Sequence, residues 1–69
     1  MSAAAPRPSK AELVDAAGEL SRRLHDLARE AYLYLDGRGE SHRAATVIES
    51  HGYASASLRN IRRVLTDAR

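Results

Sequence analysis

The sequence contains no cysteine, phenylalanine or tryptophan, and it has only two prolines and four glycines. The absence of cysteine excludes disulfides, thiolate metal sites and thiol nucleophiles. No apolar run approaches the length of a membrane span, and the N-terminus lacks the apolar segment of a signal peptide. We therefore expect a cytoplasmic protein that makes no contact with a membrane.

The small number of large apolar side chains limits the core that one copy of the chain can build. Thirteen of the hydrophobic residues are alanine, and only sixteen are Leu, Val, Ile or Tyr. Below about 70–80 residues, a single core seldom contributes more than about 3–5 kcal/mol. Because no disulfide is available, association with a second copy is the expected route to stability.

The chain is expected to be one all-α domain, residues 9–69, after a disordered lead-in, residues 1–8, that consists mostly of Ala, Pro, Ser and Arg. Apolar residues recur at helical spacing, and strand signals are absent. One long helix and two short helices are predicted, over residues 9–36, 41–51 and 55–68.

Local signals predict where these helices begin and end. Ser9 is expected to be an N-cap and, with Glu12 three residues later, to form a capping box. Gly37 suits the left-handed position after the long helix. Gly52 is expected to end the second helix.

A heptad pattern runs along the predicted long helix, with apolar residues at alternating spacings of four and three. The residues of this seam are Leu13, Ala17, Leu20, Leu24, Leu27, Ala31 and Tyr34. Two short helices folded as a hairpin would cover only part of the seam. We therefore predict a homodimer that pairs through the long helix.

Two bulky residues of the long helix, Tyr32 and Leu33, fall outside this seam. Either the short helices fold back over them, or they belong to a surface that binds a partner protein, where tyrosine is enriched.

No residue pattern indicates catalysis. His25, His42 and His51 lack the spacing of metal ligands, and no glycine-rich loop follows a strand. We therefore expect a protein that is not an enzyme and has neither a cofactor nor a metal.

Charge is distributed unevenly along the chain. Residues 11–36 carry six acids and three arginines, a net charge of −3, whereas residues 53–69 carry four arginines and one acid, a net charge of +3. An acidic stripe is predicted on the long helix, made by Glu12, Asp15, Glu19 and Asp26. This stripe is either a solvated face or a surface complementary to a basic partner.

Residues 44–65 resemble a helix-turn-helix unit with Gly52 as the turn glycine. Two positions depart from that pattern, because Ile48 is larger and His51 more polar than is usual there. The outward residues that would contact DNA are Arg59, Asn60 and Arg63. The alternative for this basic segment is a structural one, in which it complements the helix dipole or the acidic helix.

The heptads of residues 13–34 and the YLYL segment, in a short cysteine-free helical chain, resemble the small host-takeover proteins of bacteriophages. Among these, the chain is similar in length and helical style to the anti-quorum-sensing anti-activators of Pseudomonas phages. The resemblance implies that a dimer binds a host protein, either a LuxR-type transcription activator or a pilus-assembly ATPase. It also implies inhibition of transcription regulation, because the dimer covers the DNA-binding domain of the activator.

Overall fold

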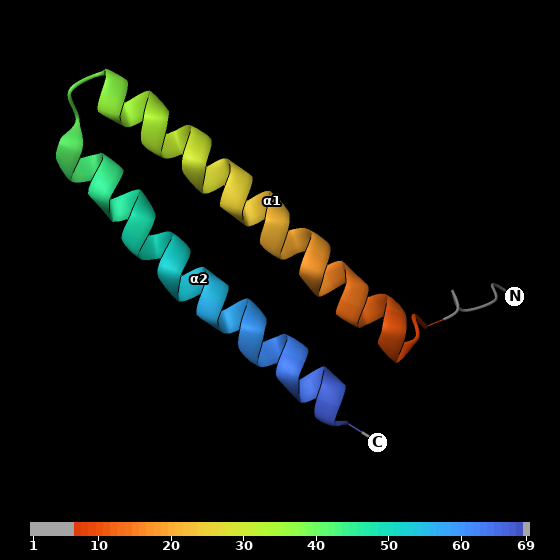
Figure 1. The fold of residues 1–69 in the computed structure, drawn as a ribbon. Helices are drawn as coiled ribbons and strands as arrows, with labels where there is room; N and C mark the ends of the chain where they lie inside the picture. The colour runs from red at the N-terminus through yellow and green to blue at the C-terminus, as the bar shows by residue number, and fades with distance from the viewer. Residues whose placement is uncertain (1–6, 69) are drawn as a thin grey trace, which may run out of the picture.

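The computed structural model describes residues 7–68 and contains two α-helices, α1 (Lys10–Gly37) and α2 (Ser41–Asp67). The helices lie side by side in antiparallel directions, with the connecting residues 38–40 at one end of the hairpin (Figure 1). The predicted all-α class is confirmed. Most of the predicted lead-in, residues 1–8, lies outside the described residues.

Helix α1 begins at the predicted N-cap. The Ser9 hydroxyl oxygen accepts a hydrogen bond of 3.1 Å from the backbone N–H of Glu12, which would otherwise lack a partner in the first turn. The Ser9 hydroxyl also donates to the Glu12 carboxylate, at 3.3 Å. The Glu12 side chain thus meets the hydroxyl, whereas a full capping box would direct it to the backbone N–H of Ser9.

The turn after α1 lies two residues later than the sequence predicts. Gly37 is the last helical residue, and Gly39 takes the left-handed conformation with a φ of 77°. The N–H of Gly39 donates to the carbonyl of Asp36 at 3.0 Å, and that of Glu40 donates to the carbonyl of Leu35 at 2.9 Å. These two bonds form a Schellman motif, which satisfies carbonyls at the end of the helix.

The prediction of two short helices is wrong, because α2 is a single helix of 27 residues that passes through Gly52. Gly52 is not among the residues with positive φ; within residues 7–68, Gly39 alone has one. A glycine in a helix interior costs about 1 kcal/mol relative to alanine. Helix-compatible residues on both sides of Gly52, and the packing of α2 against α1, outweigh that cost.

The continuity of α2 also removes the length mismatch on which the predicted dimer was based. With 28 residues in α1 and 27 in α2, the second helix accompanies the first along its whole length. One side of α1 is therefore lined by its own chain. Whether α1 needs a further partner depends on which of its residues this contact leaves exposed.

Small residues are the most buried members of the contact between the helices. Ala17, Ala28 and Ala44 are the buried apolar residues of the described chain, and Ala44 is only 1% exposed. The half-buried positions of α1 are Val14, Gly18, Ser21, Leu24, Ala31, Tyr32 and Leu35. Those of α2 are Val47, His51, Ala54, Ser55, Ala56, Leu58 and Leu65.

The observed contact and the predicted seam share only one of their two rows. Ala17, Leu24 and Ala31 belong to both. The other row of the contact is formed by residues 14, 21, 28 and 35, each one position after its predicted counterpart. One residue along a helix is a rotation of about 100°, so the predicted row turns away from α2.

Few polar contacts join the helices. The Lys10 ammonium donates to the carbonyl oxygen of Ala68 at 2.6 Å, which links the open ends of the hairpin. The His25 and His51 rings meet edge to face near the middle, with centroids 5.5 Å apart. Within residues 7–68, every ion pair is local in sequence, and none connects α1 to α2. Apolar packing between the helices therefore provides most of the cohesion.

We predict opposite effects of alanine at the two glycines that distinguish the observed fold from the predicted one. Gly52→Ala should stabilise the protein by about 0.5–1 kcal/mol, since nothing lies within 4 Å of the added methyl group and a helical glycine is replaced. Gly39→Ala should destabilise it by about 1–2 kcal/mol, because the left-handed conformation strains a side chain. Thermal unfolding followed by circular dichroism at 222 nm measures both.

Candidate interaction surfaces

A row of large apolar side chains runs along α1 beside the helix contact, and we call it the apolar row. It consists of every seventh residue from Leu13 to Tyr34, and residues at this spacing lie on nearly the same side of a helix. Its members Leu13, Leu20, Leu27 and Tyr34 are 38%, 54%, 66% and 63% exposed. These four residues belong to the seven-residue predicted dimer seam, and their own chain leaves them exposed.

Helix α2 extends this apolar row into a wider surface. Leu24, Leu27 and Ala31 of α1, together with Val47 and Ala54 of α2, line a mostly apolar hollow of about 380 Å³, to which Thr46, Ser50 and His51 also contribute. Farther along α2, the side chains of Ile61 and Val64 are exposed as well. Ile61 lies seven residues after Ala54 and Val64 fourteen after Ser50, so both share a side of α2 with the hollow. The apolar surface, defined as the apolar row with this hollow and these two residues, thus spans both helices.

The acidic stripe lies on α1 with all four members exposed: Glu12, Asp15, Glu19 and Asp26. Glu19 forms ion pairs with Arg22 and with Arg23, the latter at 3.6 Å. Exposed pairs of this kind contribute little to stability, about 0–1 kcal/mol. The stripe therefore remains accessible to a partner.

The four residues of the YLYL segment point in different directions. Leu35 is half-buried at the helix contact, and Leu33 is exposed. Tyr32 is half-buried and lines a hollow with His25 and Ile48, so α2 partly covers it. Tyr34 belongs to the apolar row. The sequence grouped Tyr32 with Leu33, but the structure separates them.

The Tyr34 side chain is held by the residue that follows α1. The Arg38 guanidinium lies 5.4 Å from the centre of the Tyr34 ring and donates to the phenolic oxygen at 3.2 Å. This cation–π contact fixes one end of the apolar row while leaving the ring exposed.

The helix-turn-helix interpretation of residues 44–65 loses its structural basis, because no turn interrupts α2. Arg59, Asn60 and Arg63 are all exposed on this continuous helix. The Arg63 guanidinium donates to the Asn60 side-chain oxygen at 3.3 Å. A recognition helix set at an angle to a supporting helix is therefore absent from residues 44–65.

The structure brings together one polar pair that sequence reasoning missed. The Ser55 hydroxyl and the His51 Nε2 atom lie 3.2 Å apart, one helical turn from each other. Their spacing of four residues was the available signal. No carboxylate contacts either His51 or His25 within residues 7–68, so the pair lacks the third member of a catalytic triad.

A search of residues 7–68 for three or more His, Cys, Asp or Glu side chains placed to hold a metal ion finds none. In the same part of the chain, neither helix is both long and apolar enough to span a bilayer.

Comparison with protein-family models, with curated proteins and with solved structures finds no match to this chain. Its function must therefore be argued from the surfaces described above.

Proposed function

We propose that the chain functions as a homodimer, in which two hairpins pack their apolar surfaces together as a four-helix bundle. The supporting observation is the exposure of Leu20, Leu27 and Tyr34 beside a helix contact in which only alanines are buried. Full burial of one large apolar side chain contributes about 1.5–3 kcal/mol. A second copy would bury several such side chains at once on each protomer.

The size of the surface suits such a dimer. A helix of 28 residues is about 42 Å long, and two adjacent helices are about 20 Å wide, which gives a face of roughly 800 Å². That is about the area that each partner contributes to a stable protein–protein interface.

The pattern of α1 is also that of a bundle helix. A helix with two apolar neighbours needs a stripe wider than the two rows of a simple coiled coil. Helix α1 has three rows: residues 14, 21, 28 and 35 toward α2, the apolar row beyond, and Ala17, Leu24 and Ala31 between them.

The dimer predicts that polar substitutions in the apolar row separate the two chains. The wild type should have twice the molar mass of one chain in solution. The double variant Leu20→Gln with Leu27→Gln should have the molar mass of a single chain and should lose part of its helicity. Sedimentation equilibrium at micromolar concentration measures the mass. Leu33→Gln is the matched control, because Leu33 is 51% exposed but lies outside the apolar surface.

A wild-type chain that is fully helical and monomeric at these concentrations would refute the dimer. So would a Leu33→Gln variant that dissociates as readily as the double variant.

We further propose that this dimer is not an enzyme and acts by binding and inhibiting another protein. The acidic stripe supports a partner with a basic surface, and Leu33 near its end offers an exposed apolar contact. The DNA-binding domain of a LuxR-type transcription activator, which the phage resemblance implies, has the required basic character. Occlusion of that domain would keep the activator from its operator.

The acidic stripe can be tested with a purified LuxR-type activator and its operator DNA. The double variant Asp15→Asn with Asp26→Asn should need an about fivefold higher concentration than the wild-type chain to release the operator from the activator. Each exposed ion pair contributes about 0.2–1 kcal/mol. An electrophoretic mobility shift assay measures the release. Glu49→Gln with Asp67→Asn, which removes two exposed acids from α2, should behave like the wild type.

If the wild-type chain leaves operator binding unchanged at tens of micromolar, this activator is not the partner. If the two double variants release the operator equally poorly, the net charge of the chain and not the acidic stripe is responsible for binding the activator.

A further inference from the structure

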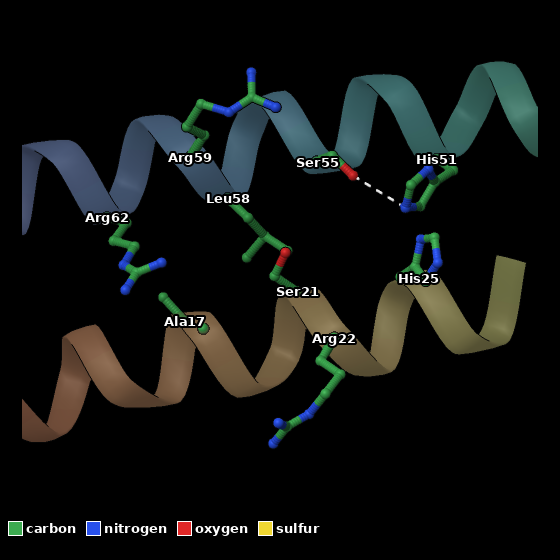
Figure 2. A pocket seen from close by; sticks show the side chains of 10 residues that line it. Ala17, Ser21, Arg22, His25, His51, Ser55, Leu58, Arg59 and Arg62 are labelled. Atoms are coloured by element: carbon green, nitrogen blue, oxygen red, sulfur yellow. Dashed lines mark hydrogen bonds between the residues drawn. The ribbon is translucent and has the colours of Figure 1, made fainter.

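A basic groove lies between the helices on the side away from the apolar row, and His51 separates it from the apolar hollow by lining both. It has a volume of about 460 Å³, and its polar lining includes Arg22, Arg59, Arg62, His25, His51 and the hydroxyls of Ser21 and Ser55 (Figure 2). Arg22 and Leu27 point to different sides of α1, because five residues of a helix turn it by one full turn and about 140° more. The groove therefore stays accessible in the proposed dimer.

The positive charges of the groove are poorly neutralised. No aspartate or glutamate is among the residues that line it. Arg22 pairs with Glu19, but within residues 7–68 neither Arg59 nor Arg62 forms an ion pair. Cations gathered around a concave surface without carboxylates favour an anionic ligand.

Gly18 shapes one end of the groove. The Arg62 guanidinium lies 3.9–4.0 Å from the position that a Cβ atom of residue 18 would occupy. Figure 2 shows this side chain pointing toward α1 near Ala17, while Arg22 and Arg59 extend in opposite directions from the two rims. Arg62 therefore points into the groove, whereas Arg22 and Arg59 would reach a bound ligand only after their side chains rotate inward.

The other end of the groove is bounded by the two histidines. The His25 and His51 rings meet across the helices, and the Ser55 hydroxyl contacts His51 from the groove side. Because both ends are bounded, the groove suits a compact ligand better than a continuous strand. Its volume lies within the range of about 300–1,000 Å³ that is typical of small-molecule sites.

We propose that this groove binds the phosphate groups of a small phosphorylated molecule of about nucleotide size. Guanidinium groups match phosphate oxygens with paired donors, and serine hydroxyls and imidazole N–H groups add single hydrogen bonds. The site depends on residues of one chain alone, so it does not rest on the proposed dimer or on its protein partner.

Isothermal titration calorimetry of the full chain with pyrophosphate and with ATP tests the proposal. Both probes should bind saturably and compete with each other. Arg62→Gln should weaken both by about tenfold or more, as expected for loss of charged hydrogen bonds, and Arg59→Gln should weaken them in the same direction. Arg63→Gln is the matched control, since it removes the same charge from an exposed residue that does not line the groove.

The absence of saturable binding of either probe at millimolar concentration would overturn the site. So would equal weakening by Arg63→Gln, or binding of duplex DNA without binding of pyrophosphate. If Arg62→Gln loses helicity by circular dichroism, Arg59→Gln decides the outcome, because Arg59 is an exposed rim residue. ATP binding tighter than pyrophosphate binding supports a nucleotide, and equal affinity supports recognition of the phosphates alone.

Discussion

The close approach of two nearly equal helices through alanine is the contact on which the rest of the molecule depends. Ala17, Ala28 and Ala44 are buried there, and no large side chain within residues 7–68 is fully buried. Small residues allow the helix backbones to come near each other, and Leu24, Leu35, Leu58 and Leu65 lie half-buried around them. Other large apolar residues, Leu13, Leu20 and Leu27 among them, lie at the edge of the contact and are exposed.

As a result, the hairpin has an apolar side, a basic side and an acidic side. The apolar row occupies one edge of the contact, and the groove with Arg59 and Arg62 occupies the other. The acidic stripe lies on the exposed part of α1 between them. Because these surfaces lie on different sides of the same helices, the proposed association through the apolar surface would leave the charged surfaces available to other molecules.

Local signals were sufficient for the class of the fold and for the start of α1. Ser9 acts as the predicted N-cap, and the helical periodicity of α1 is real. The break at Gly52 was mispredicted because glycine is only a weak signal inside a helix, and its cost is smaller than the gain from packing a continuous α2 against α1. Gly37 and Gly39 lie two residues apart, and backbone hydrogen bonding selected the later one.

The sequence by itself determined that this chain is helical, that it lacks cysteine chemistry, and that apolar residues recur along α1 with a heptad period. Only the tertiary structure decided which row faces α2, and therefore which row is exposed. The rows 13–20–27–34 and 14–21–28–35 have the same seven-residue period, and both flank the row of Ala17, Leu24 and Ala31. Periodicity therefore cannot distinguish them. The smaller side chains at Ser21 and Ala28 allow the closer helix contact, and this difference in size leaves Leu20 and Leu27 on the surface.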